Sequence, residues 1–274
     1  MQPIAQPGLV ESIAADSERR FGGLRRLYGD ASYETVRALR LAVVGLGGVG
    51  SWTVEALARC GVAELVLVDL DQVAESNINR QVQALTSTLG AAKVEALRAR
   101  VHEIHPDCVV HCVEEFVDEN NWPALLSLRA HLLPIDGLID ACDQVRAKAT
   151  LAAWARREQI PFVTVGAAGG KQRPQDVQVE DLGALTHDPL LASLRYQLRR
   201  KHGLPRAGQM NVQCVYSREA VGTPEQSCSA DGSLNCHGYG SSVMVTSTFG
   251  MVAAAQLLQE IFGKSLAKRK KIPL

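Results

Sequence analysis

Apolar runs alternate with amphipathic stretches along the first two thirds of the chain. Residues 39–45, "LRLAVVG", are apolar apart from one arginine, which is typical of a strand buried on both faces of a parallel sheet. Residues 51–61, "SWTVEALARCG", carry apolar side chains at helical spacing and end at Gly61. This pair therefore predicts a buried strand followed by a helix that a glycine terminates.

The same alternation continues to about residue 166. The helix predicted over 90–106 has Val94, Leu97, Val101 and Ile104 on one face and ends at Pro106. Strands that alternate with helices predict a mostly parallel sheet with right-handed crossovers, and hence a Rossmann-like α/β fold with helices on both faces. The remaining predicted strands are 63–71, 108–116, 136–143 and 160–166, and the remaining helix is 144–159.

The pattern changes after Gly166. Residues 176–182 and 212–217 predict two further strands, and Asp188 with Pro189 predicts the start of a helix that ends near His202. Residues 203–240 are rich in Gly, Ser and Pro around the second of these strands, which predicts a flexible loop covering an active site.

Residues 241–258 carry no charge and approach the length of a membrane span. They include Ser, Thr and Gln as well as Gly250, so we predict a buried packing helix. Association with a membrane through this segment is the alternative.

The charges balance overall, with 29 Lys and Arg against 29 Asp and Glu, so the whole chain does not favour a polyanionic partner. Cations are concentrated in 194–203, "LRYQLRRKHG", and in 264–271, "KSLAKRKK". Each cluster fits either a solvated surface or a contact with nucleic acid.

The seven cysteines are odd in number and form no C-x-x-C pair, which indicates a reducing, cytoplasmic compartment and argues against a structural zinc. The N-terminus has neither a basic start nor an apolar stretch, so it does not resemble a secretion signal.

Gly45, Gly47 and Gly50 have the G-x-G-x-x-G spacing of a phosphate-binding turn at the start of a helix. Asp69, which ends the second predicted strand, can bind ribose hydroxyls. We therefore expect one domain over 1–274, with a nucleotide-binding core at 41–166 and a substrate-binding and covering segment at 167–274. An NAD-dependent oxidoreductase would satisfy the same tests.

The block "DLDQVAESNINRQ", residues 69–81, favours a nucleoside triphosphate over a redox carrier. A hydride carrier has no need of this many polar side chains, whereas Arg and Asn donors neutralise charge that develops on phosphoryl oxygens. Lys93 could add a phosphate contact, and Asp143 could hold magnesium through oxygen. The polar residues in question are Asp71, Asn77, Asn79, Arg80 and Gln81.

With "GLGGVGS", "GAAKVE" and "DACDQVRAK", this block resembles the ubiquitin-activating-like adenylating enzymes, which include the ThiF, MoeB and HesA proteins. The resemblance implies an arginine supplied by a neighbouring subunit, with Arg20 as the first candidate and Arg19 the second, and hence a homodimer. It implies an ATP site lined by Gly45, Gly47, Gly48 and Gly50, with Asp69 on the ribose, Asn77, Arg80, Gln81 and Lys93 on the phosphates, and Asp143 on magnesium.

Sulfur-carrier activators of this family usually hold zinc with two C-x-x-C pairs, which this chain lacks. The segments "RRFGGLRRLYG", "VTVGAAGGK", "VQCVYS" and "NCHGYGSSVMVTSTFG" instead resemble the branch that cyclises threonylcarbamoyladenosine at position 37 of tRNA. This resemblance implies a ligase-type reaction in which the threonyl carboxylate attacks ATP. An oxygen of the modification then displaces AMP, and the two cationic clusters hold the tRNA.

Three alternatives remain: an adenylase for a sulfur-carrier protein, the NAD-dependent oxidoreductase, and a tRNA-binding scaffold without catalysis. Cys236, beside His237, could contact a sulfur-handling partner such as a cysteine desulfurase or its acceptor, or form a thioester, and we favour a cysteine with no covalent role. A monovalent cation in the later glycine-rich segment also stays open.

Overall fold

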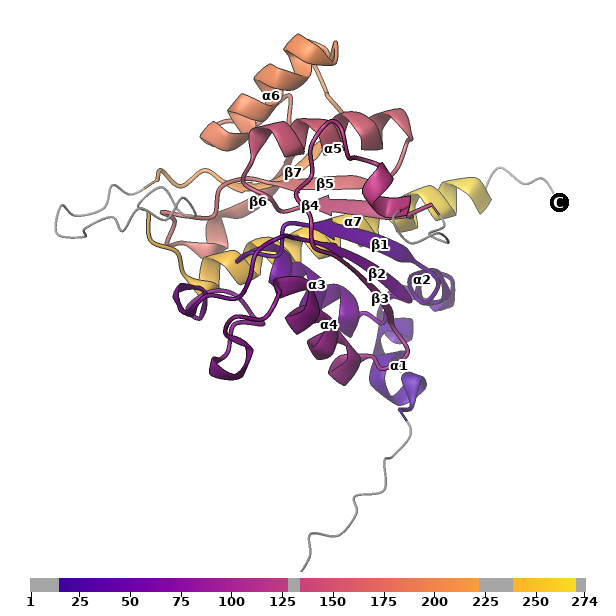
Figure 1. Cartoon of the computed structure of the whole chain (residues 1–274). Coiled ribbons are helices and arrows are strands. Elements are labelled where there is room, and N and C mark those ends of the chain that lie inside the picture. The colour runs from indigo at the N-terminus through magenta and orange to yellow at the C-terminus, as the bar shows by residue number, and fades with distance from the viewer. Residues whose placement is uncertain (1–14, 128–133, 222–238, 270–274) are drawn as a thin grey trace, which may run out of the picture.

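A computed structural model describes residues 15–127, 134–221 and 239–269. One seven-stranded sheet forms its centre, in the order β3-β2-β1-β4-β5-β7-β6 (Figure 1). All neighbouring strands are parallel except β6 and β7. The strands are β1 (Arg40–Val44), β2 (Glu64–Val68), β3 (Val109–Val113), β4 (Gly137–Asp140), β5 (Phe162–Val165), β6 (Val177–Asp181) and β7 (Gln213–Ser217).

Helices cover both faces of this sheet, as the sequence predicts (Figure 1). One apolar core joins α3, α4 and α7 to one face, and a second core joins α5 and α6 to the other. The Rossmann-like fold is therefore confirmed. The helices are α1 (Ser17–Tyr28), α2 (Asp30–Val36), α3 (Gly50–Arg59), α4 (Lys93–Ile104), α5 (Val145–Arg157), α6 (Pro189–Lys201) and α7 (Val243–Arg269).

Two predicted helix ends have the expected geometry. Gly61 follows α3 with a φ of 74°, the left-handed conformation that glycine adopts without steric cost. Asp188 precedes α6, and its carboxylate accepts a hydrogen bond from the backbone N–H of Leu191 at 3.0 Å. Both helix ends could be predicted from the local sequence, because the left-handed φ of Gly61 and the side-chain cap of Asp188 involve only residues that are close in the sequence.

The uncharged stretch at 241–258 forms most of the packing helix α7. Phe249 and Leu257 are fully buried on it. A side chain at Gly250 would place its Cβ 2.6 Å from the Val49 carbonyl oxygen, so glycine lets α7 lie directly against the start of α3. A search of the described ranges finds no helix with the length and apolarity to cross a bilayer.

The N-terminal segment forms α1 and α2, which the apolar pattern of the sequence does not predict. Gly22 and Gly23 lie inside α1, and glycine weakens a helix by about 1 kcal/mol relative to alanine. Phe21, Tyr33 and Val36 are buried, so tertiary packing stabilises these two short helices where local propensity does not.

Candidate active site

The glycine turn lies at the carboxyl-terminal edge of the sheet, where β1 and β4 end side by side. Gly45 has a φ of 84°, and a Cβ on it would lie 2.7 Å from the backbone nitrogen of Cys142. A Cβ on Gly50 would lie 1.8 Å from the Gly45 carbonyl oxygen. The turn therefore contacts the loop after β4. Gly47 faces open space, so its backbone is accessible to a phosphate.

Asp69, Asp71 and Lys93 form an acid–base cluster beside this turn. The Asp69 carboxylate accepts hydrogen bonds from the backbone N–H groups of Leu46 at 2.6 Å and Asp71 at 2.8 Å. The Lys93 Nζ lies 2.6 Å from Asp71 Oδ2 and 3.9 Å from Asp69 Oδ1. Burial raises the pKa of Asp69 despite the attraction of Lys93. A carboxylate offers about four acceptor positions, so Asp69 retains capacity for ribose hydroxyls.

Arg80 is held against the glycine turn by its backbone. Its carbonyl oxygen accepts hydrogen bonds from Trp52 Nε1 at 3.0 Å and Thr246 Oγ1 at 3.3 Å. A Cβ on Gly48 would lie 3.4 Å from Arg80 Cγ. The exposed guanidinium donates to the Ser76 carbonyl oxygen at 2.5 Å. The structure thus brings Arg80 to the turn, and the sequence did not indicate the contribution of Thr246.

Asn77 and Gln81 are buried, and their side-chain oxygens are used within the protein. Asn77 Oδ1 accepts from the backbone N–H of Ala74 at 3.0 Å, and Gln81 Oε1 accepts from Gln83 Nε2 at 3.1 Å. Gln83 Nε2 also donates to the Leu46 carbonyl oxygen at 3.0 Å. Both predicted residues therefore shape the segment beside the glycine turn. Gln83, which no sequence motif singled out, links that segment to the turn.

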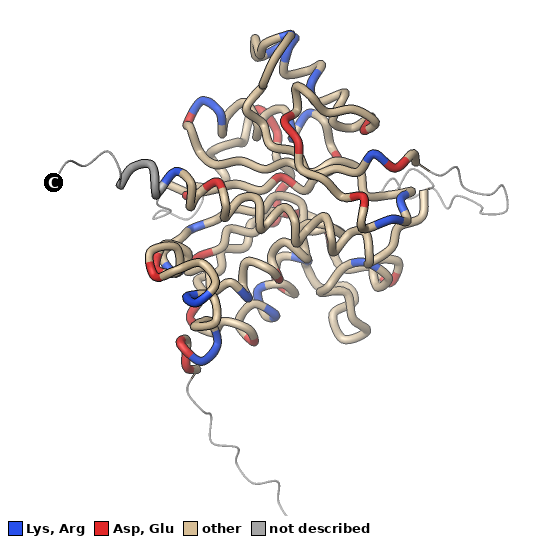
Figure 2. The backbone as a smooth tube through the Cα atoms, turned by 180° about the vertical axis from the view of Figure 1, so that it is seen from behind, with Lys and Arg blue, Asp and Glu red and all other residues tan. Residues whose placement is uncertain are grey.

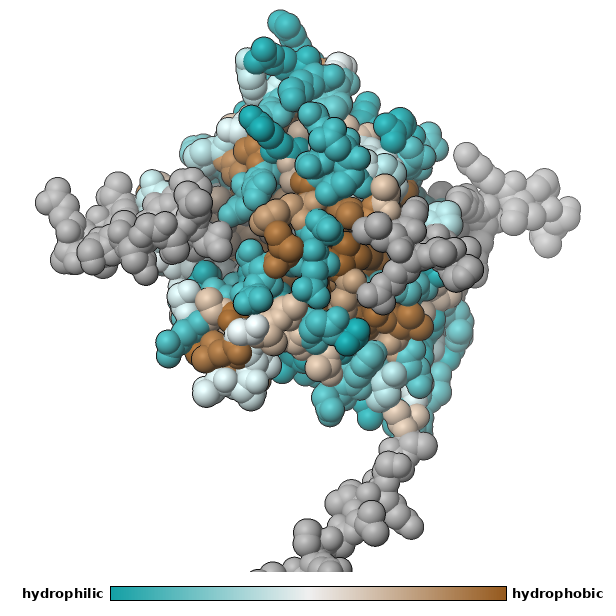
Figure 3. Space-filling model, in the orientation of Figure 1, coloured by the Kyte–Doolittle hydropathy of each residue, from teal (hydrophilic) through white to brown (hydrophobic). Residues whose placement is uncertain are grey.

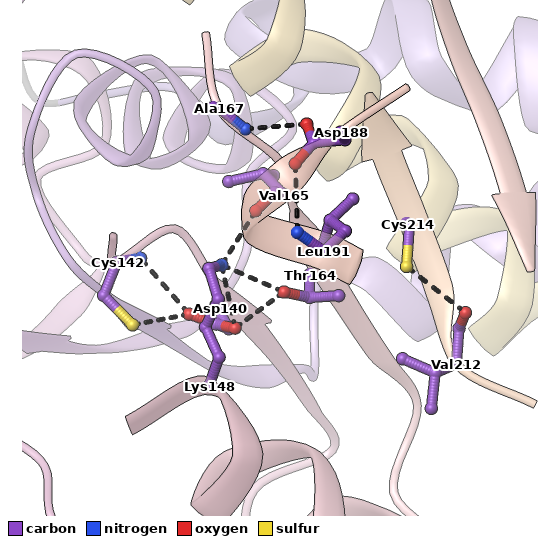
Figure 4. Close-up of polar contacts among 10 residues, drawn as sticks. All are labelled: Asp140, Cys142, Lys148, Thr164, Val165, Ala167, Asp188, Leu191, Val212 and Cys214. Atoms are coloured by element: carbon purple, nitrogen blue, oxygen red, sulfur yellow. Dashed lines mark hydrogen bonds and ion pairs between the residues drawn. The ribbon is translucent and has the colours of Figure 1, made fainter. Parts of the chain in front are cut away.

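A second acid–base cluster lies beneath the loop after β4 (Figure 4). Asp140 is fully buried and accepts hydrogen bonds from Cys142 N, Cys142 Sγ, Lys148 Nζ and Thr164 Oγ1. Lys148 Nζ also donates to the Val165 carbonyl oxygen at 2.8 Å. The roles of Asp140, Lys148 and Thr164 could not be predicted, because nothing in the local pattern shows which polar residues become enclosed.

Asp143, on the same loop, is exposed and precedes α5. Among the residues that the structure describes, no three His, Cys, Asp or Glu side chains converge as a metal site. Magnesium that is bound with a nucleotide usually takes one or two carboxylates and completes its shell with phosphate oxygens and water. The accessible carboxylate of Asp143 fits such an ion, whereas the four donors on Asp140 make that carboxylate unsuitable.

Arg20 does not join this site within its own chain. Its Nη1 donates to the carbonyl oxygens of Glu103 at 3.3 Å and Ile104 at 2.7 Å, at the end of α4. Lys93 begins the same helix, which has 12 residues and is therefore about 18 Å long. Within its own chain, the Arg20 guanidinium therefore contacts the end of α4 that is opposite Lys93.

The cationic clusters differ in part from the prediction. On α6, Arg195 donates to the Leu182 and Leu185 carbonyl oxygens and Arg199 to those of Pro205 and Arg206. These two guanidinium groups therefore stabilise the fold, whereas contact of the cluster with tRNA stays a prediction. Of the 264–271 cluster only the Lys264 side chain is described. Cys236 lies outside the described residues.

Comparisons with known proteins cover nearly the whole chain. The ThiF family profile matches residues 21–272. A tRNA threonylcarbamoyladenosine dehydratase of Haemophilus influenzae is 38% identical over 252 residues, which are 90% of this chain and 95% of the relative. The crystal structure of the Escherichia coli enzyme TcdA with ATP superposes with a TM-score of 0.83 at 39% identity, over 93% of this chain and 99% of that one. The same enzyme with AMP gives 0.82 at 40% identity, over the same shares. The chain belongs to the ThiF family.

Proposed function

We propose that this protein uses ATP to dehydrate threonylcarbamoyladenosine at position 37 of tRNA to its cyclic form. One observation carries the proposal: the glycine turn, Asp69, Lys93 and Arg80 lie together at one edge of a fold that matches an ATP-bound dehydratase of this nucleoside over 93% of the chain. The rival oxidoreductase offers no role for this group of cations, and the family match favours adenylation.

The chemistry follows from where charge develops. The threonyl carboxylate attacks the α-phosphorus of ATP, and pyrophosphate leaves. An oxygen of the modification then attacks the acyl carbon, and AMP leaves with the oxygen that the carboxylate loses. Neither step needs a strong base, so the protein acts by positioning the reactants and neutralising phosphate charge.

Each residue has a role that its position supports. The backbone N–H groups at the start of α3 face the phosphates across Gly47, and Asp69 holds the ribose. Lys93 and Arg80 neutralise phosphate oxygens. When bound, magnesium would polarise the phosphates, and Asp143 would hold it from the exposed loop. Asn77 and Gln81 act by keeping the Arg80 segment in place.

The proposal extends to the assembly. A homodimer would carry Arg20 of one copy to the nucleotide of the other, and the position of this arginine at the end of α4, opposite the end that carries Lys93, supports that arrangement. We place the enzyme in the cytoplasm, since its substrate is tRNA. We also propose that a sulfur-handling partner contacts Cys236 and that a monovalent cation binds near the later glycines. Residues 167–274 would bind the substrate and cover the site.

The decisive experiment incubates the protein with ATP and tRNA that carries threonylcarbamoyladenosine, followed by mass spectrometry of the nucleosides. We expect loss of one water per modified nucleoside together with release of AMP. No mass change, combined with adenylation of a protein that ends in Gly-Gly, would instead support the sulfur-carrier adenylase. Nicotinamide absorbance changes without a need for magnesium would support the oxidoreductase.

Arg80→Ala and Asp143→Ala should each strongly slow the exchange of pyrophosphate into ATP in the presence of modified tRNA. A preorganised donor contributes on the order of 3 kcal/mol to such a transition state, so losses of about a hundredfold are expected. Arg98→Ala, which removes an exposed arginine that pairs with Glu95 on α4, is the matched control and should keep full activity. Retained exchange in both site variants would contradict the assignment.

A further inference from the structure

The outer face of α6 is a surface that the nucleotide site does not use. Leu191, Leu194 and Leu198 are fully buried on the inner face, so the opposite face looks outward. This helix stands at the top of the molecule, and its surface there is hydrophilic (Figure 3). A shallow hollow of about 510 Å³ is lined by Ala192, Ser193, Tyr196, Gln197, Arg200 and Lys201.

This part of the chain is strongly cationic, although the whole chain is neutral. Residues 189–212 contain five Lys and Arg and no Asp or Glu. Arg195 and Arg199 are used within the fold, whereas Arg200, Lys201 and Arg206 are exposed, and within the described residues no hydrogen bond or ion pair engages their side chains. Lys and Arg mark the outer end of the helix (Figure 2). An unpaired cluster of one sign attracts a polyanion.

Tyr196 adds an aromatic ring to the cations. It is 62% exposed and lies four residues before Arg200, so the two side chains occupy the same face one turn apart. One turn earlier, Ala192 and Ser193 are too small to cover the ring. An exposed aromatic beside unpaired cations is typical of surfaces that stack an unpaired RNA base while holding the adjoining phosphates.

The helix begins at the reacting edge of the sheet. Asp188 accepts a hydrogen bond from the backbone N–H of Ala167, just after β5, at 3.0 Å. From this anchor to Lys201 the helix rises about 20 Å. Position 37 belongs to the anticodon loop, and the anticodon stem leads away from that loop. The outer face of α6 therefore lies along a path that the stem could follow from the site.

We propose that the outer face of α6 binds the anticodon stem-loop of the substrate tRNA. Arg200 and Lys201, supported by Arg206, contact phosphates, and Tyr196 stacks on an unpaired base. This inference rests on the proposed function, because it takes tRNA as the substrate. The proposal concerns only the cluster on α6. Lys264, in the other cluster, donates to the Gln159 carbonyl oxygen, and Gln159 precedes β5 at the opposite edge of the sheet.

The test measures binding of an anticodon stem-loop RNA, modified at position 37, across a series of salt concentrations. Arg200→Gln/Lys201→Gln should lower the slope of log affinity against log salt by about 1 to 2, since each phosphate contact contributes somewhat less than 1. Tyr196→Ala should weaken binding roughly tenfold without changing that slope, and Tyr196→Phe should bind as the unchanged protein does.

Arg98→Gln/Arg157→Gln is the matched control, because it removes two cations that lie outside both cationic clusters and pair with Glu95 and Glu158. It should change neither the affinity nor the slope. In turnover, the α6 variants should raise the KM for tRNA and leave the KM for ATP and kcat unchanged. Unchanged binding in the α6 variants, or a loss confined to the control variant, would overturn the inference.

The two proposals fail separately. If the unchanged protein removes water from the modified nucleoside and the α6 variants bind RNA normally, only the α6 surface is wrong. If the unchanged protein removes no water from any modified tRNA, the proposed function is wrong, and the salt series still decides whether α6 binds RNA.

Discussion

Two carboxylate–lysine clusters lie on either side of the glycine turn, and only one of them is accessible to a ligand. Lys93 and Asp71 are 2.6 Å apart, and the Asp71 side chain is 40% exposed. Lys148 and Asp140 are 3.1 Å apart, and both side chains are fully buried. The same two residue types are therefore open to solvent in one place and enclosed by the fold in the other.

The enclosure of Asp140 explains this difference. Thr164 and Cys142 donate to its carboxylate beside Lys148, so its acceptor positions are filled by the protein. Burial opposes the charge on Lys148, but Asp140 together with the thiols of Cys142 and Cys214 outweighs burial and raises the Lys148 pKa. In the first cluster the donors come mainly from the backbone, and acceptor capacity remains. Available hydrogen-bonding capacity, rather than residue type, distinguishes the two clusters.

The largest effect that this comparison predicts is on stability. Lys148→Met leaves the buried Asp140 carboxylate without its counter-charge, which should lower the free energy of unfolding by about 3–5 kcal/mol. Urea denaturation measures this change.

The double variant Asp140→Asn/Lys148→Met is the control. It removes both charges. The amide oxygen can still accept from Cys142, and the amide NH2 can donate to the Thr164 hydroxyl, so most of the lost stability should return. If Lys148→Met is as stable as the unchanged protein, the buried cluster does not stabilise the fold as argued.

The next effect is on activity. Lys93→Met should lower kcat/KM by about a hundredfold, because it removes a preorganised cation from the phosphates. Its free energy of unfolding should fall by only about 1 kcal/mol, since Asp71 is partly exposed to water. Turnover and urea denaturation are measured on the same variant. A large loss of activity with a small loss of stability would distinguish the Lys93 cluster from the buried Lys148 cluster.

The same variant has a signature in pH. Burial raises the pKa of Asp69, and the charge of Lys93 opposes that rise. Ribose binding by the carboxylate is present above this pKa and is lost as the pH falls through it. Without Lys93 the pKa rises further, so ATP affinity should fall at a higher pH. If ATP affinity falls at the same pH in Lys93→Met and in the unchanged protein, Asp69 is not the ribose ligand.

The smallest effect concerns the thiol of the buried cluster. Cys142→Ala removes one of the donors to Asp140, and a single hydrogen bond contributes about 1 kcal/mol. The free energy of unfolding should fall by about that amount, while pyrophosphate exchange stays within a few-fold of normal. A complete loss of exchange would indicate that Cys142 positions Asp143 far more strongly than one hydrogen bond allows.

Much of the fold could be predicted from local patterns. The strand of 39–45, the helix ending before Gly61 and the cap at Asp188 all appear where the sequence placed them. These features depend on periodicity and on the conformational needs of single residues. The short helices α1 and α2 were not predicted, because Phe21 is buried by contact with His105 and Gly61, which are distant in the sequence.

The glycine spacing, Asp69, Arg80 and Lys93 were recognisable in the sequence alone, since their chemistry depends on residue type and on the ends of strands. Only the tertiary structure decided that Asp140 and Lys148 are enclosed, that Gln83 and Thr246 support the turn, and that Arg20 lies far from its own site. Burial and the direction of a side chain arise from contacts between segments distant in sequence, and no local pattern encodes them.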